Sequence, residues 1–362
     1  MRCRTHSGYP PTHEGVVYAG ALMTVLVGKQ RARGSVAAVV AAIALAAAAV
    51  PHVQAGGGQA ADDELAARLL KGAIDVHAHV DPDSVGPTSF QGARLMDVDD
   101  LARLTLRRGM RGFVAKLHHD STAHLAYMTR KAVPGIEVFG LVGLNRAMGG
   151  VNPAAVRHMA EVKGGWGRIV NMPTWDAEFY VRNSNDPGRP FVSVSRNGRL
   201  LAEVTEIIAI MAGTKTRDSG GRLTLYTGHN SPQESLMMVR EAGRLGVPVM
   251  VSHPMIEFIS MPLTIMEEAA KLGAYLEIVS AFATAKDAED EIGKHVEAIR
   301  RIGADRFILS SDRGQANGPT HPDGLVAAAK ALMSQGITEA EVGRMMKDNP
   351  ARLLGLPSPS IP

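Results

Sequence analysis

The stretch of sequence that decides the fold is AIDVHAHV, residues 73–80. Polar and apolar side chains alternate in it, with the period of a β-strand whose successive residues point to opposite faces. We therefore expect Asp75, His77 and His79 to share one face of a strand and to point into a barrel. The face toward a helix layer would carry the apolar residues Ile74, Val76, Ala78 and Val80.

This unit, a short apolar strand followed by an amphipathic helix, recurs along the chain and is typical of a parallel α/β fold. Strands are expected at residues 73–80, 112–118, 137–144, 167–172, 223–227, 247–253, 274–279 and 306–311. Helices are expected at 98–108, 123–131, 153–162, 200–212, 232–244, 262–271, 289–301 and 325–334. Eight such units predict a (β/α)8 TIM barrel. The rival fold is a doubly wound open sheet, but the glycine-rich loop that it would favour after the first strand is absent from the sequence.

The segment ahead of the barrel has the order of a secretory signal. Lys29, Arg31 and Arg33 precede an apolar run at 36–50, and small residues follow it up to Ala55. The run is shorter than the about 20 apolar residues of a membrane span. We expect residues 1–60 to be a signal peptide with a disordered segment, and residues 61–362 to be the barrel domain. The protein would then be exported, periplasmic or secreted, with membrane contact only through this signal.

Composition excludes several classes of protein. The chain has 362 residues, 45% of them hydrophobic, which is ordinary for a globular protein with a large core. The formal net charge is +3, and the basic residues beyond the signal are scattered among acids, so no nucleic-acid partner is expected. Cleavage after Ala55 would remove Cys3, the single cysteine, and so exclude disulfides. A homo-oligomer is compatible with the sequence.

Five residues that can bind a metal lie where the expected strands end. His77 and His79 end the first strand, His229 the fifth, His253 the sixth and Asp312 the eighth. Because TIM barrels build their active sites at the carboxyl ends of the strands, these side chains would converge. Imidazole and carboxylate groups suit Zn²⁺ and, less selectively, Mn²⁺, Fe²⁺ or Co²⁺. Taken alone, the two histidines of the first strand would also fit hydrogen-bonded interior residues, and the aspartate would fit a strand-end cap.

Such a site has a defined chemistry. A catalytic zinc ion lowers the pKa of its water to about 7, and a carboxylate beside it can carry the proton to the leaving group. Asp312 is the candidate for this proton shuttle.

With these residues the chain resembles the amidohydrolase superfamily, from residue 73 to 356. The matching residues are Asp75-x-His77-x-His79, His229, His253, Asp312 and the trailing segment NPARLLGL at 349–356. The resemblance implies that His77, His79, His229 and Asp312 bind metal. It also implies that His253 either ligates a second metal or polarises the substrate. Two-metal members commonly supply a bridging carboxylated lysine or a glutamate from strand four, which here reads RIVNMPT at 168–174 and has neither. One metal is therefore favoured, with two as the alternative.

Lys116 lies on the second expected strand, on the same face as His118. Three interpretations are open. Lys116 is a carboxylated metal ligand, an ammonium group that grips an anionic substrate, or a salt-bridge partner of Glu277 on the seventh strand. The candidates for substrate contact are His118, His119, Trp175, Asn230, Glu277 and Arg313. Trp175 belongs to the longest irregular segment, 173–199, which would cover the barrel mouth.

The favoured function is that of an enzyme, a metal-dependent hydrolase that cleaves an amide, lactone or related C–N or C–O bond of a small molecule. A decarboxylase or hydratase of the same superfamily is an alternative, which Lys116 and Arg313 would favour as contacts for an anion. A non-catalytic metal-binding protein of the cell envelope is the other alternative.

Overall fold

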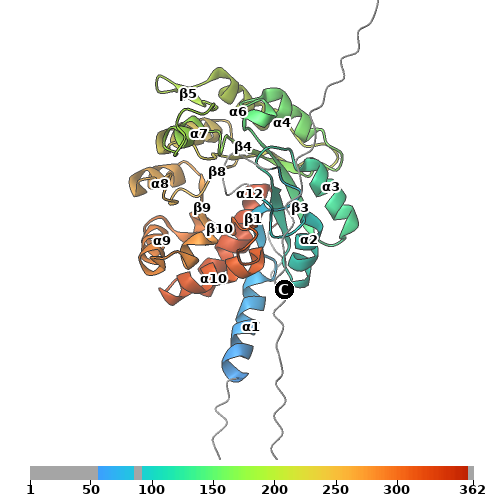
Figure 1. Cartoon of the computed structure of the whole chain (residues 1–362), viewed down its shortest axis with the longest axis vertical. Coiled ribbons are helices and arrows are strands. Elements are labelled where there is room, and N and C mark those ends of the chain that lie inside the picture. Colours follow the sequence, from blue (N-terminus) through green and yellow to red (C-terminus); the bar gives the residue numbers. More distant parts are fainter. Residues whose placement is uncertain (1–55, 85–91, 358–362) are drawn as a thin grey trace, which may run out of the picture. The chain divides into compact units, whose positions relative to one another are not determined.

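Eight parallel strands form the main sheet of the computed structural model, which describes residues 56–84 and 92–357. They are β1 (Ile74–His79), β2 (Gly112–Lys116), β3 (Glu137–Gly143), β4 (Gly167–Asn171), β7 (Thr224–Tyr226), β8 (Val249–Val251), β9 (Tyr275–Val279) and β10 (Phe307–Ser310). The strands pair in chain order. The N–H of Asp312 donates to the carbonyl of His77, and that of His79 to the carbonyl of Arg313, each at 2.9 Å, so the end of the last strand meets the first. The predicted (β/α)8 barrel is confirmed (Figure 1).

Helices lie around the strands (Figure 1). The α-helices are α1 (Gly56–Leu70), α2 (Val98–Arg107), α3 (Ala123–Ala132), α4 (Pro153–Ala160), α5 (Glu178–Arg182), α6 (Ala202–Gly213), α7 (Pro232–Arg244), α8 (Leu263–Lys271), α9 (Ala288–Ile302), α10 (His321–Ser334), α11 (Glu339–Gly343) and α12 (Asn349–Leu354). Short 3₁₀ turns are η1 (Arg146–Met148), η2 (Ser280–Thr284) and η3 (Ala304–Arg306), and η4 (Arg344–Asp348) is a π-helical turn. Local sequence explains the starts of several helices. Ser231 and Glu234, for example, form a capping box at α7, with Pro232 at its first position.

The apolar core has an inner and an outer layer. Inside the barrel, Phe139, Tyr226 and Ile308 belong to one buried cluster with Leu353 and Leu354 of α12. Helix α12 closes the end where the strands begin, because Thr224 at the start of β7 donates to the carbonyl of Leu353 at 3.0 Å. Between strands and helices lies the larger outer layer. At the opposite end of the barrel, where the strands finish, lie polar residues such as His77, His79 and Asp312.

A β-bulge in β1 breaks the regular alternation of faces that we expected for AIDVHAHV. From Asp75 to Ala78 the first strand advances three residues, whereas its partner β2 advances two, from Phe113 to Ala115. One extra residue in β1 interrupts the alternation of faces. The prediction was therefore wrong for Ile74 and Val76, which belong to the inner core instead of the helix layer. Ala78 and Val80 do pack with the outer layer, as expected.

Asp75 also differs from the expectation that it points into the barrel beside the histidines. Its Oδ1 accepts hydrogen bonds from the backbone N–H groups of His77, at 3.1 Å, and Ser311, at 3.0 Å. Burial raises the pKa of this carboxyl to about 6, although these hydrogen bonds oppose the rise. Asp75 therefore joins the first and last strands of the barrel.

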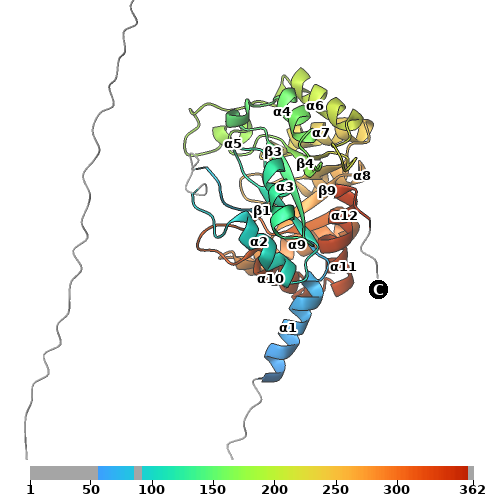
Figure 2. The same cartoon turned by 90° about the vertical axis from the view of Figure 1, so that its right-hand side faces the viewer.

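Two other segments differ from the sequence-based expectation. Segment 173–199 is not irregular throughout, since it contains α5 and a two-stranded hairpin of β5 (Ser195–Arg196) and β6 (Arg199–Leu200). Residues 56–60, expected to be disordered, begin α1, which lies beside α10 and α11 (Figure 2). The apolar run of the predicted signal, 36–50, lies outside the described residues. Within the described ranges, no helix is both long and apolar enough to cross a membrane.

Candidate metal centre

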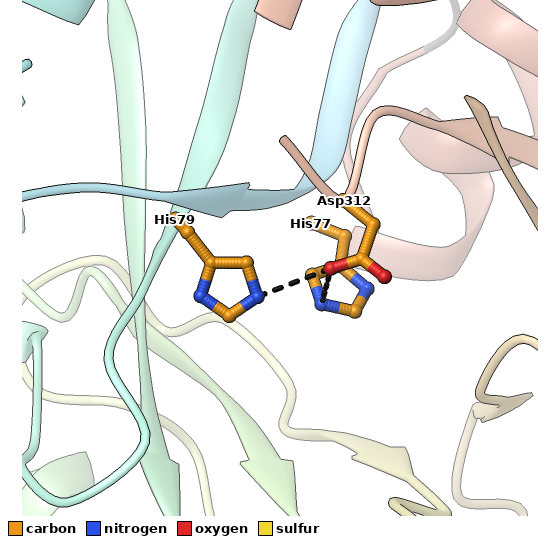
Figure 3. Close-up of side chains that lie close together, drawn as sticks. All are labelled: His77, His79 and Asp312. Atoms are coloured by element: carbon orange, nitrogen blue, oxygen red, sulfur yellow. Dashed lines mark hydrogen bonds and ion pairs between the residues drawn. The ribbon is translucent and has the colours of Figure 1, made fainter. Parts of the chain in front are cut away.

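His77, His79 and Asp312 meet at the carboxyl end of the barrel (Figure 3). Oδ1 of Asp312 lies 3.0 Å from Nε2 of His77 and 3.1 Å from Nε2 of His79. The three donor atoms all lie within 4.8 Å of one another. Two imidazole nitrogens and one carboxylate oxygen at this spacing form a donor set that suits a divalent transition metal.

The His77 ring lies between two carboxylates, those of Glu277 and Asp312, which together favour a positive charge at this position. Nδ1 of His77 lies 2.8 Å from Oε1 of Glu277, and because a carboxylate can only accept, Nδ1 carries the hydrogen. Nε2 then faces Oδ1 of Asp312, and a lone pair cannot face a carboxylate oxygen at that distance without a positive charge nearby. Burial opposes the charged form of His77, but Asp312 and Glu277 raise the pKa of its imidazole to about 9. A proton, an ammonium group or a metal ion can supply the charge.

The side-chain nitrogen of Lys116 lies at this position. Its Nζ lies 2.6 Å from Nε2 of His77, and burial lowers the pKa of its ammonium group. One of the three open interpretations of Lys116, a salt bridge to Glu277, is not among the ion pairs of the described residues, and Glu277 pairs instead with Nδ1 of His77 on the far side of the ring. Carboxylation of Lys116 and its contact with an anionic substrate stay predictions.

His253 and His229 extend the cluster. The ring centroid of His253 lies 5.8 Å from that of His77 and 5.0 Å from that of His229. Burial lowers the pKa of His253 to about 4 and that of His229 well below its ordinary value, so both are neutral and able to bind a metal. Nδ1 of each ring is buried without a hydrogen-bond partner among the described residues. Buried unpaired nitrogens are costly unless a ligand or water satisfies them, which again fits a ligand at this cluster.

The backbone is strained at two of these residues. His253 has a φ of 27° and Asp312 a φ of 49°, both in the left-handed region that non-glycine residues rarely adopt. Each such residue costs about 1–3 kcal/mol and persists where the surrounding structure holds it, most often at functional sites. Both residues lie two positions after the ends of their strands, β8 and β10, at the carboxyl end of the barrel.

His118 is held by a network of its own. Its Nε2 accepts a hydrogen bond of 2.9 Å from the indole N–H of Trp175, so its hydrogen lies on Nδ1, which is 3.4 Å from Oγ1 of Thr174. Burial lowers the pKa of the His118 imidazole well below its ordinary value. The ring lies 4.7 Å from that of His79, between the centre and the loop that carries Trp175.

An aromatic wall, which we define as Trp175, Tyr180 and Phe258, covers His229. The ring centroids of these residues lie 4.9, 5.5 and 4.9 Å from that of His229, respectively. Trp175 and Tyr180 come from segment 173–199, which the sequence placed over the barrel mouth. Phe258, from the loop after β8, was missed, since a single aromatic residue in a loop carries no periodic signal.

Asn145 was also missed, although its position two residues after β3 follows the same strand-end rule that found the histidines. Its side chain is fully buried and bonds to His118, Thr174 and Asp176. It anchors the segment that carries Trp175.

The remaining candidates for substrate contact are placed as follows. Asn230 is buried and donates to the carbonyl oxygens of Thr227 and Pro173. The Arg313 guanidinium donates to Ser280 and to Thr284, tying the end of β10 to η2. The His119 ring lies 6.2 Å from that of His118. A substrate contact by any of these residues, and by Glu277, stays a prediction.

Comparison with known proteins identifies the family of this chain. Residues 72–277 match the family of unknown function DUF6282. The chain belongs to this family. No curated protein matches the DUF6282 chain.

Solved structures resemble this DUF6282 protein at low sequence identity. An amidohydrolase from Burkholderia multivorans has a TM-score of 0.52 at 14% identity, covering 79% of this chain and 99% of that one. An organophosphorus hydrolase from Deinococcus radiodurans has a TM-score of 0.49 at 17% identity, covering 80% and 94%. A putative 2-pyrone-4,6-dicarboxylic acid hydrolase from Pseudomonas putida has a TM-score of 0.48 at 16% identity, covering 78% and 97%. The Burkholderia structure shares the (β/α)8 barrel fold of this DUF6282 chain.

Proposed function

We propose that this DUF6282 protein is a metal-dependent hydrolase that cleaves an amide, lactone or related C–N or C–O bond of a small molecule. The observation that carries the proposal is the convergence of His77, His79 and Asp312, donor atoms within 4.8 Å of one another, at the carboxyl end of the barrel. The Burkholderia multivorans protein that shares this fold is an amidohydrolase, which supports the reaction class.

The residues present fit one divalent ion, with Zn²⁺ first and Mn²⁺ or Fe²⁺ as alternatives. His77, His79 and Asp312 would hold it, with His229 and His253 as further candidates from the family resemblance. When bound, such an ion polarises the scissile carbonyl and makes water acidic enough to react at neutral pH.

The protein side chains supply proton transfer and exclusion of water. Burial opposes the ionised form of Asp312, but His77 and His79 hold the pKa of its carboxyl well below the ordinary value, so it is a carboxylate that can accept a proton. Its side chain is 19% exposed, compared with 2% for His77 and 4% for His79, so it is the member of the trio most open to water. The aromatic wall shields His229 and offers apolar surface to a substrate.

The contacts of Arg313 count against the lyase alternative. A decarboxylase or hydratase would use cationic side chains to hold a substrate carboxylate, and Lys116 and Arg313 were the candidates. The Arg313 guanidinium is engaged by Ser280 and Thr284, whereas Lys116 stays at the centre beside His77.

The test combines metal analysis with a substrate panel of lactones, amides, esters and carboxylic acids. We expect the purified protein to hold about one divalent ion per chain, the number that a trio of this kind binds. His79→Ala should lose the ion. Asp312→Asn should lower hydrolysis by roughly 10²–10⁴-fold, the usual contribution of a proton-transfer residue.

Asp305→Asn is the matched control, because Asp305 is exposed and pairs only with Arg344 at the protein surface among the contacts described. A protein that binds none of the three metals, or a His79→Ala variant with full metal content, would overturn the proposal. Turnover confined to carboxylic acids would favour the lyase alternative.

A further inference from the structure

Glu277 occupies a junction between three strands of the barrel. It lies on β9, is 1% exposed, and receives hydrogen bonds on both carboxylate oxygens. Oε1 accepts from Nδ1 of His77 at 2.8 Å and from the hydroxyl of Ser310 at 2.6 Å. Oε2 accepts from the backbone N–H of His253 at 2.9 Å. The three donors come from β1, from β10 and from the residue two positions after β8.

The bond to His77 decides how that imidazole can act. Because Glu277 only accepts, it holds the His77 hydrogen on Nδ1, and Nε2 is left to face Asp312 and Lys116. In metal sites a carboxylate bonded to the outer nitrogen of a ligating histidine sets both its tautomer and its ring orientation. Glu277 is in this position relative to His77.

The other two bonds act on neighbouring residues of the centre. The N–H of His253 is held by Glu277 where the backbone has a strained φ of 27°, so the bond helps to keep His253 in that conformation. Ser310 stands two residues before Asp312, at the end of β10. One carboxylate therefore bonds directly to His77 and His253, and it reaches the strand that carries Asp312.

We propose that Glu277 is a positioning residue, which fixes the Nδ1–H tautomer of His77 and the backbone of His253 so that the centre can bind a divalent cation. This inference rests on the proposed function and replaces a direct substrate contact by Glu277. Both oxygens are engaged by protein donors and the side chain is buried, so the carboxylate acts through the histidines.

Glu277→Gln tests the proposal, because an amide has one accepting oxygen and cannot accept from all three donors. We expect the affinity of the full-length protein for Zn²⁺, measured by competition with a chelator, to fall roughly 10- to 100-fold, as is typical when such a partner is lost. Glu137→Gln is the matched control. Glu137 lies at the start of β3, away from the centre, and accepts a hydrogen bond of 3.0 Å from Arg111, so the Zn²⁺ affinity of this variant should stay within about threefold of the wild type.

The second measurement is ¹⁵N NMR of the imidazole rings, which reports the tautomer directly. In the zinc-loaded wild type we expect His77 to carry its hydrogen on Nδ1. Hydrogen on Nε2 would overturn the proposal, and this result needs no variant, so it stands even if Glu277→Gln does not fold. Unchanged Zn²⁺ affinity in a folded Glu277→Gln protein would also overturn it.

The two proposals fail in different ways. If the wild type binds no metal, the proposed function is wrong, and the spectrum of the metal-free protein still reports whether His77 depends on Glu277. If the wild type binds Zn²⁺ and Glu277→Gln binds it equally well, only the positioning role is wrong.

Discussion

Replacing Asn145 with alanine should both destabilise the protein and release Trp175 from the centre. The Asn145 side chain makes four hydrogen bonds. Nδ2 donates to the carbonyl of His118 and to Oγ1 of Thr174, each at 2.8 Å, and Oδ1 accepts from the N–H groups of Thr174 at 2.9 Å and Asp176 at 3.3 Å. The side chain has no exposed surface, so water does not replace these partners without a rearrangement.

The magnitude follows from the groups that lose a partner. Two backbone N–H groups and one carbonyl would be left unsatisfied, and each costs about 1–3 kcal/mol when buried. Partial hydration of the loop offsets some of this cost, so we expect the free energy of unfolding to fall by about 3–5 kcal/mol. Asn152→Ala is the control. Asn152 caps α4 at a half-buried position, and loss of such a cap costs about 1 kcal/mol.

Equilibrium denaturation measures the free energy of unfolding, and fluorescence quenching measures the exposure of Trp175 in segment 173–199. The chain has two tryptophans, so Trp166→Phe leaves Trp175 as the reporter. In this background Asn145→Ala should increase quenching of Trp175 by acrylamide, because its segment is no longer anchored beside His118. A loss of stability no larger than that of Asn152→Ala, with unchanged quenching, would refute the assignment of Asn145 as the anchor.

Two further predictions concern stability. Burial lowers the pKa of His295, which stacks on Phe282, so below about pH 6.5 the unfolded chain takes up a proton that the folded chain resists. The stability advantage of the wild type over His295→Gln should therefore shrink as the pH falls from 8 to 5, and an advantage that is constant or grows in acid, measured by urea denaturation, would contradict this. At Gly314 the φ is 130° and a Cβ would lie 2.2 Å from the carbonyl oxygen of His79, so Gly314→Ala should cost about 2–4 kcal/mol and weaken metal binding. Gly293→Ala, in the exposed part of α9 where nothing lies near an added Cβ, should raise the melting temperature instead, and a Gly314→Ala protein as stable as wild type would refute the reasoning.

Much of the fold could be predicted because the signals are local. Alternation and helical periodicity predicted the eight strands of the barrel, and the rule that barrel sites form at strand ends selected His77, His79 and Asp312. The structure brings these three together although 233 residues separate His79 from Asp312. The same local signals described segment 173–199 less well, since its short helix and hairpin are too brief to produce a clear period.

Taken by itself, the sequence determined the order of the strands and the kinds of side chain that finish them, since both depend on near neighbours along the chain. It could not determine the bulge in β1, the partner of Glu277 or the approach of Phe258 to His229. The partner of Glu277 depends on strand register, and its bond to His77 joins residues 200 positions apart. A register shift of one residue turns a side chain to the opposite face, so only the closed barrel decides that Glu277 meets His77 and that Lys116 lies on the other side of the same ring.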